Sequence, residues 1–260
     1  MYIKTETQDA VEVITIDRQQ ALNALNPEVL EELKAAFEAV DQNEIRCIIL
    51  TGAGEKSFVA GADIASMSTM TKAEGEAFGK LGNDIFLMIE NFPIPVIAAV
   101  NGFALGGGNE LAMSCDIRIC SDNALFGQPE VGLGITPGFG GTQRLARLVG
   151  PGMAKHITYA ALNINAEEAL RIGLVNAVYT PEELMPNAVK LATKISRNAP
   201  IAVRACKKAI NEGLEVSIEK GIEIEEKLFG SCFETHDQVE GMACFLSREK
   251  PKPKPVFTNN

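Results

Sequence analysis

Two glutamates in glycine-rich surroundings are the residues of this chain that could do chemistry. Glu110 lies in the segment GGGNEL (106–111) and Glu130 in the segment GQPEVG (127–132). A carboxylate beside a backbone without side chains is an acid/base group that a substrate can approach closely. The pair therefore predicts proton transfer, with backbone N–H groups close by to hold a developing negative charge.

Composition limits what kind of protein can carry this pair. With 260 residues, 46% hydrophobic and 22% charged, the chain can bury a large core as one domain or as a domain with an appendage. The net charge of −10 argues against general nucleic-acid binding, which needs a basic face. The N-terminus has no apolar signal region, and no apolar run approaches the ~20 residues of a membrane span. We expect a cytoplasmic protein that binds neither membrane nor nucleic acid.

The cysteines and histidines favour neither disulfides nor a metal. No two cysteines have CxxC spacing, and most lie in apolar surroundings, so we interpret them as reduced core residues. They are Cys47, Cys115, Cys120, Cys206, Cys232 and Cys244. The two histidines, His156 and His236, have no metal-ligand spacing and no carboxylate cluster near them in sequence. The chain also lacks a GxSxG nucleophile elbow, a P-loop and a GxGxxG motif, which disfavours hydrolysis by a serine triad and nucleotide binding of those kinds.

Hydrophobic periodicity predicts the elements that must position the glutamates. Residues 2–7 and 10–17 alternate apolar and polar, as in a hairpin with one buried face. Asn26 and Pro27 are typical of an N-cap and of the first residue of a helix. Further along, buried strands alternate with helices, which indicates α/β layering with parallel strand pairs. The predicted strands are 47–50, 95–100 and 116–120, and the predicted helices are 72–91 and one that begins near Gly107.

The end of the chain has a different pattern. After about residue 198 only helices are predicted, over 200–213, 215–232 and 235–247. We therefore divide the chain into a catalytic region, 1–198, and a helical region, 199–260. The last three helices carry more apolar residues than a small appendage needs for its own core, which is typical of an obligate interface.

Three motifs together resemble one known family. AGADI (60–64), NGFALGGGNEL (101–111) and GQPEVGLGITPG (127–138) are similar to the motifs of the crotonase, or enoyl-CoA hydratase, superfamily. The resemblance runs over nearly the whole chain, including GGTQRL (140–145), and is strongest to the short-chain crotonases of butyrate-forming bacteria. It implies an α/β spiral of ββα units, followed by a helical region that makes a trimer or a dimer of trimers.

The resemblance also implies a reaction. The thioester carbonyl of an acyl-CoA would lie between the backbone N–H groups of Ala62 and Gly107, which stabilise the enolate formed when water adds or leaves. Glu110 would activate the water at Cβ, and Glu130 would deliver or remove the proton at Cα. Gly138 would present its N–H to the water. No cofactor is implied, because coenzyme A is part of the substrate.

Further positions are implied for the rest of the substrate. The family holds coenzyme A with two segments that correspond here to Gln20, Ala21, Leu22, Ala24, Ala60, Asp63 and Ile64. Lys56 and the C-terminal lysines are either phosphate contacts or solvated surface residues. Met67, Met70 and Phe86 are candidates for the acyl end. Phe229 and Phe233 either line a neighbouring subunit's adenine pocket or belong to a trimer interface.

Two other classes of protein stay open. One is a different enzyme of the same fold, an enoyl-CoA isomerase or a hydroxyacyl-CoA thioesterase. The presence of both glutamates favours the hydratase, because the other activities commonly lack one or move it. The second class is a non-catalytic RNA-binding relative, which the acidic net charge disfavours.

Overall fold

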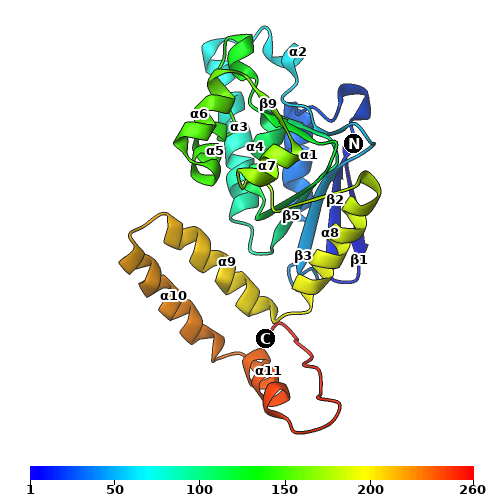
Figure 1. Ribbon diagram of the computed structural model, residues 1–260, viewed down its shortest axis with the longest axis vertical. Helices are drawn as coiled ribbons and strands as arrows, with labels where there is room; N and C mark the ends of the chain where they lie inside the picture. The colour runs from blue at the N-terminus through cyan, green and yellow to red at the C-terminus, as the bar shows by residue number, and fades with distance from the viewer.

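Ten strands form two sheets in the computed structural model, which describes residues 1–260 (Figure 1). The six-stranded sheet contains, in spatial order, β1 (Ile3–Gln8), β2 (Val11–Ile16), β3 (Cys47–Gly52), β5 (Val96–Val100), β7 (Ile117–Ser121) and β10 (Ala177–Tyr179). The four-stranded sheet contains β4 (Ser57–Val59), β6 (Phe103–Leu105), β8 (Leu125–Gly127) and β9 (Asn163–Asn165). Only the pairs β1–β2 and β8–β9 are antiparallel.

The order of the strands describes a spiral. In each of the pairs β3/β4, β5/β6 and β7/β8, the first strand joins the larger sheet and the second joins the smaller one. Helices α2 (Ile64–Met67) and α3 (Lys72–Glu90) follow the first pair, and α4 (Gly107–Ser114) follows the second. The third pair leads into a 3₁₀ turn, η2 (Glu130–Leu133), and α5 (Gly141–Val149). The expected ββα spiral is confirmed.

Local signals in the sequence account for the first elements. The predicted hairpin is present as β1 and β2, paired from Ile3–Ile16 to Gln8–Val11. The expected buried face is wrong for β1, where only Ile3 is buried because this strand lies at the edge of the sheet. Helix α1 (Pro27–Glu38) begins where predicted, and the Asn26 side chain accepts a hydrogen bond of 2.9 Å from the Val29 N–H. An N-cap of this kind satisfies one of the N–H groups that the first helical turn leaves without a partner.

The central strands are apolar throughout because helices cover both faces of the larger sheet. Leu50 and Ala98 belong to the main core with residues of α1, α3 and α4, whereas Ile49 and Ile97 face residues of α8 (Pro181–Ser196). Successive side chains of a strand point to opposite faces, so a strand buried on both sides reads as a continuous apolar run. The remaining short elements are η1 (Gln19–Ala21), α6 (Pro151–Tyr159) and α7 (Ala166–Arg171).

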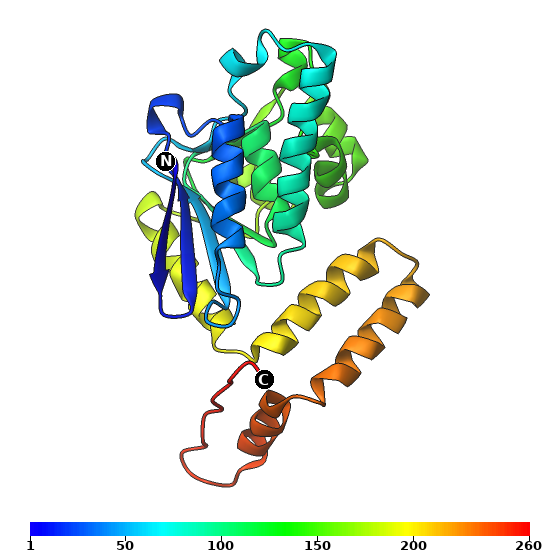
Figure 2. The ribbon, with the colours of Figure 1, turned by 180° about the vertical axis from the view of Figure 1, so that it is seen from behind.

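Three helices extend from the end of this body. Helices α9 (Pro200–Leu214) and α10 (Ile218–Cys232) lie side by side, and α11 (His236–Leu246) and the tail follow them (Figures 1 and 2). The three predicted C-terminal helices are thus confirmed. Many of their large apolar side chains are exposed: Ile210, Leu214, Ile218, Ile222, Phe229, Phe233, Val239, Met242, Phe245 and Leu246.

The cysteines are all free thiols, and Cys47, Cys115, Cys120 and Cys244 are buried. The prediction that they are core residues is wrong for Cys206, which is exposed on α9, and Cys232 is only partly buried. Both lie on the helices that project from the body and have few neighbours to cover them. None of the helices has the length and apolar character to cross a membrane.

Candidate active site

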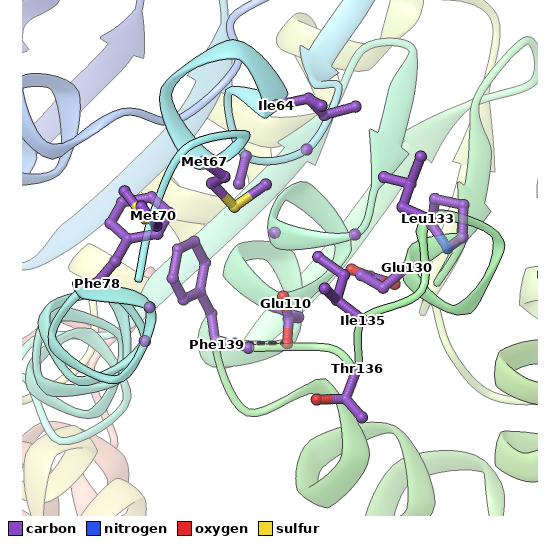
Figure 3. A pocket seen from close by; sticks show the side chains of 18 of the residues that line it. Ile64, Met67, Met70, Phe78, Glu110, Glu130, Leu133, Ile135, Thr136 and Phe139 are labelled. Atoms are coloured by element: carbon purple, nitrogen blue, oxygen red, sulfur yellow. Dashed lines mark hydrogen bonds between the residues drawn. The ribbon is translucent and has the colours of Figure 1, made fainter. Parts of the chain in front are cut away.

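A cavity of about 420 Å³ opens beside the N-terminus of α4 (Figure 3). Its walls come from the 60–79 segment, from the turn that precedes α4, and from the 129–139 segment. Segments that are far apart in sequence meet here because each turn of the spiral brings the end of its second strand to the same side. The predicted site residues that line the cavity are Ala60, Ala62, Ile64, Gly107, Glu110, Glu130 and Gly138.

Glu110 is the more deeply buried of the two glutamates. It lies in α4, whose residues are all buried, and its side chain is 1% exposed. Oε1 accepts hydrogen bonds from the backbone N–H of Phe139 (2.9 Å) and of Gly141 (2.6 Å). Burial raises the pKa of this carboxyl to about 7, and the nearby charge of Glu130 adds to the rise. The two N–H groups oppose the shift, and so does Arg144.

Glu130 begins η2 on the opposite wall and is 9% exposed. Burial raises its pKa to about 7 as well. When the Gln128 side-chain amide is oriented with its nitrogen toward Glu130, this nitrogen donates to both oxygens of the carboxylate, at 3.0 and 3.1 Å. Gln128 is fully buried, and sequence reasoning missed it, although it stands two residues before Glu130 in the same motif.

Glycines keep this region open for close approach. Gly106 has φ +50° and ψ −120°, a conformation that residues with a side chain rarely adopt, and a Cβ there would lie 2.5 Å from Glu130 Oε1. A Cβ on Gly108 would lie 1.9 Å from the Val59 carbonyl oxygen. Glycine at 106 therefore makes room for the carboxylate, and glycine at 108 lets α4 pack directly against β4.

The backbone N–H groups of Ala62 and Gly107, both at the cavity, have no acceptor within the protein. The Leu25 N–H donates to Gly61 O (2.9 Å), and Leu25 O accepts from the Asp63 N–H (2.7 Å), as in a parallel strand pair. The N–H of Ala62, which lies between Gly61 and Asp63, therefore faces away from Leu25. Gly107 is the first residue of α4 and has no helical acceptor. A Cβ on Gly107 would lie 3.4 Å from Ala62 N, so the two donors are neighbours.

Comparison with known proteins identifies the family of this chain. Residues 6–256 match the model of the family described as enoyl-CoA hydratase/isomerase. The chain belongs to the enoyl-CoA hydratase/isomerase family. It is 57% identical to a short-chain-enoyl-CoA hydratase of Clostridium acetobutylicum over 246 residues, which are 94% of each chain. It is 56% identical to a crotonyl-CoA hydratase of Syntrophomonas wolfei, over 94% of this chain and 95% of the relative.

Solved structures give the same result for the fold. An enoyl-CoA hydratase from Bacillus anthracis superposes with a TM-score of 0.95 at 38% identity, and the match covers 100% of both chains. The match therefore includes the C-terminal helices. The resemblance and the fold class expected from the motifs are both confirmed.

The two segments that are expected to hold coenzyme A lie side by side in the structure. The N–H of Ala60 donates to Leu22 O at 3.0 Å, which joins the 20–24 segment to the 60–64 segment. Gln20, Ala21, Leu22 and Ala24 do not line the cavity itself. Asp63 does not line it either: its carboxylate caps α2 and forms an ion pair of 2.7 Å with Arg18. Lys56 is exposed.

The remaining walls of the cavity are mostly apolar, as an acyl chain requires. Met67 and Met70 line it, as expected for the acyl end. Phe86 does not: it is fully buried and packs behind Phe139, with ring centroids 5.6 Å apart. The wall residues that sequence reasoning missed include Phe78, Leu133, Ile135, Thr136 and Phe139.

Proposed function

We propose that this protein catalyses the reversible addition of water to short-chain 2-enoyl-CoA thioesters, converting crotonyl-CoA to 3-hydroxybutyryl-CoA. The single observation that carries the proposal is the pair of buried glutamates with raised pKa values that face one cavity beside two unpartnered N–H groups. The names of the two relatives with more than half of their residues identical support the same reaction.

The thioester carbonyl oxygen lies between the N–H groups of Ala62 and Gly107 in this proposal. Negative charge builds up on that oxygen as water adds to the double bond and an enolate forms. Each donor contributes on the order of 3 kcal/mol to the stability of the transition state. The N-terminus of α4 acts in the same direction, because a helix dipole favours negative charge there.

The two glutamates divide the proton transfers. Glu110 accepts a proton as the water oxygen bonds to Cβ, and Glu130 donates a proton to Cα as the enolate collapses. Gly138, whose N–H has no acceptor in the protein, holds the water. The raised pKa values support these roles, because two neighbouring carboxyls resist ionising together and one is left able to donate. Dehydration runs the same steps in reverse.

Coenzyme A enters as part of the substrate, and the reaction needs no other cofactor. We assign its contacts to Gln20, Ala21, Leu22 and Ala24 on one segment and to Ala60, Asp63 and Ile64 on the other. The hydrogen bond between Ala60 and Leu22 supports this, because it lets both segments face a single pantetheine chain.

We further propose that the chain works as a homo-oligomer, a trimer or a dimer of trimers. Residues 1–198 form the catalytic region and residues 199–260 form the contacts between subunits. The exposed apolar side chains of α9, α10 and α11 support this assembly, because a surface of this kind is stable only when a partner covers it.

A chain-length series of 2-enoyl-CoA substrates tests the function. Hydration removes the absorbance of the conjugated enoyl thioester, and we expect the highest kcat/KM for the four-carbon substrate. The Glu110→Gln/Glu130→Gln double variant serves as the inactive control. Isomerisation of a 3-enoyl-CoA, or release of free coenzyme A, without hydration of any 2-enoyl-CoA would contradict the proposal.

A further inference from the structure

Glu110 is held by a turn of the chain that itself needs support. The two N–H groups that donate to its carboxylate, from Phe139 and Gly141, lie in the 138–141 turn, which follows η2 and includes the first residue of α5. Three of its four residues are glycine, and residues 138–140 belong to no helix or strand. A glycine-rich turn has more conformational freedom than other segments. Something outside the turn must therefore keep its N–H groups directed at Glu110.

One face of α3 provides the support. The ring of Phe139 packs edge-on against Phe78, at 5.1 Å between centroids, and against Phe86. Gly82 makes room for that ring, since a Cβ there would lie 2.3 Å from it. These α3 positions recur at spacings of four, so they lie on one side of the helix.

The polar contact from α3 to the turn is made by Asn83. Its Nδ2 donates to Gly138 O at 2.8 Å and to Gly79 O, one helical turn back, at 2.9 Å. The Gly138 carbonyl and the Phe139 N–H belong to the same peptide unit. That unit is planar and trans, so its C=O and N–H point in opposite directions. Asn83 therefore holds one end of the peptide unit whose other end donates to Glu110.

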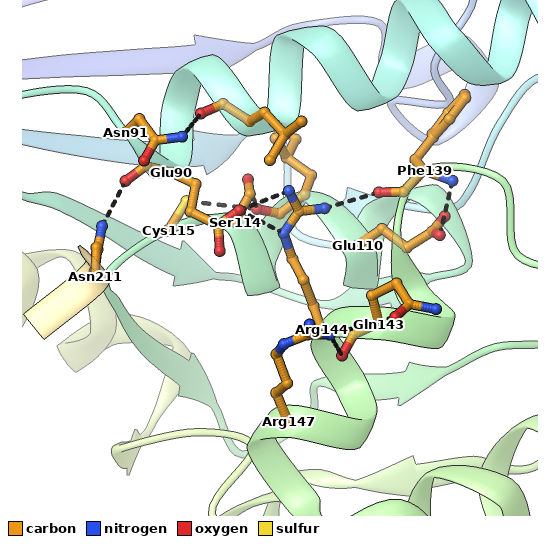
Figure 4. A network of polar contacts seen from close by, with 12 residues as sticks. Glu90, Asn91, Glu110, Ser114, Cys115, Phe139, Gln143, Arg144, Arg147 and Asn211 are labelled. Atoms are coloured by element: carbon orange, nitrogen blue, oxygen red, sulfur yellow. Dashed lines mark hydrogen bonds and ion pairs between the residues drawn. The ribbon is translucent and has the colours of Figure 1, made fainter. Parts of the chain in front are cut away.

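A second side chain holds the next peptide unit. Arg144 Nη1 donates to Phe139 O at 3.0 Å, and Glu90 Oε2 accepts from the same guanidinium at 2.7 and 3.1 Å (Figure 4). Glu90 is the last residue of α3, and its carbonyl accepts from Asn211 of α9 at 3.1 Å. Two successive carbonyls of the turn are thus fixed from α3, one directly and one through Arg144.

We infer that Asn83 is a positioning residue for Glu110, which it orients through the Gly138–Phe139 peptide unit. The inference rests on the proposed function, in which Glu110 activates the water. Without the amide, the Gly138 carbonyl loses its side-chain donor, and the peptide unit can turn so that the Phe139 N–H moves away from the carboxylate. Glu110 then loses one of the two backbone donors that keep its pKa from rising further.

The chain offers a matched control for the experiment. Asn91 is the C-cap of the same helix. Its Nδ2 donates at 2.9 Å to Leu87 O, again one turn back, but it makes no hydrogen bond to the 138–141 turn. Asn83→Ala and Asn91→Ala therefore remove the same side chain and the same local hydrogen bond, and only the first removes the bond to Gly138. Asn83→Asp keeps the shape and, when ionised, also lacks the donor.

For Asn83→Ala we expect kcat to fall about 10-fold with KM changed less than about twofold, as for the loss of an interaction that matters in the transition state. The acidic limb of the kcat/KM profile should move to higher pH, because Glu110 must ionise to act as a base. Asn83→Asp should show the same loss of kcat at neutral pH and above, and Asn91→Ala should match the wild type.

Hydrogen–deuterium exchange at the Phe139 amide gives a readout that does not depend on activity. It should become faster in Asn83→Ala and stay unchanged in Asn91→Ala. Wild-type kcat and wild-type exchange in Asn83→Ala would overturn the inference, and so would equal changes in both alanine variants. If the wild type hydrates no enoyl-CoA but Phe139 exchange still depends on Asn83, the proposed function fails and the support of the turn by Asn83 stands.

Discussion

Helices α4 and α10 differ in how far the rest of the chain buries them. Every residue of α4 is buried, whereas α10 has no buried residue even though Ile222 and Phe229 lie on it. The first helix lies inside the spiral, and the second packs mainly along α9, outside the body (Figure 2). One chain is therefore enough to complete the region around the glutamates, but it leaves the C-terminal region with uncovered apolar surface.

Charged groups of the site differ from those on the outer side of the C-terminal helices, although Lys207 of α9 is largely buried and pairs with Asp116 of the body at 2.8 Å. In the site, Arg144 is 8% exposed and is held by Glu90 and a backbone carbonyl. On α9 and α10, the ion pairs Lys208–Glu212 and Lys220–Glu223 have all their side chains more than half exposed. Exposed pairs of this kind contribute about 0–1 kcal/mol. These exposed pairs therefore add little to the stability of the C-terminal region.

Removal of the C-terminal region should have the largest effect. A chain that ends at residue 199 keeps Glu110 and Glu130 but loses α9, α10 and α11. We expect insoluble or inactive protein, because the surface of the body that α9 covers becomes exposed and the proposed contacts between subunits are lost. Sedimentation and the hydration assay measure the result. An active full-length monomer of 27.9 kDa would show that this region is complete without a partner.

Replacing a glutamate by glutamine in the site and on α10 compares how the two regions depend on a single carboxylate. Glu110→Gln and Glu130→Gln should each lower kcat at least ~100-fold, because glutamine keeps the shape but cannot accept or donate the proton. Glu226→Gln, at an exposed position on α10, is the matched control and should leave kcat unchanged. Near-normal turnover in either of the first two variants would mean that its assigned role is wrong.

The stability of the buried site should also depend on pH. Burial raises the pKa of Glu110 from 4.5 to about 7, so the folded protein holds this proton more tightly than the unfolded chain. The contribution is complete below about pH 4.5 and is lost as the pH rises through about 7. Glu110→Gln should therefore gain on the order of 3 kcal/mol relative to the wild type between pH 5 and pH 8. Chemical denaturation at both pH values measures this difference, and equal pH dependence of the two proteins would contradict it.

Glycine-to-alanine substitutions compare how closely α4 and α10 are packed, and they should have the smallest effects. Gly108→Ala in α4 should destabilise the protein by about 1–3 kcal/mol, since the new methyl group meets the Val59 carbonyl. Gly230→Ala in α10 meets no atom within 4 Å and should stabilise the helix by up to about 1 kcal/mol. Denaturation at one fixed protein concentration gives both values. Destabilisation by Gly230→Ala would indicate that a neighbouring subunit packs closely at that position.

Much of the fold could be predicted because its signals are local. The strands of the β1–β2 hairpin, the Asn26 N-cap and the continuous apolar runs of β3 and β5 each depend on neighbours within a few residues. The motifs around Glu110 and Glu130 also identified acid/base candidates without any structure. Side-chain chemistry and short-range periodicity are properties of the sequence alone, so these predictions needed nothing else.

Only the tertiary structure decided which groups surround those candidates. The N–H donors to Glu110 come from 29 and 31 residues away, and Asn83 reaches Gly138 across 55 residues. Phe86 was expected in the cavity but lies in the core, because the ring of Phe139 occupies the space in front of it. Periodicity predicts which face of an element is buried, but the groups that meet across that face depend on how the turns of the spiral stack. Burial and the charge of a distant neighbour then raise the pKa of Glu110, and neither can be read from the residues next to it.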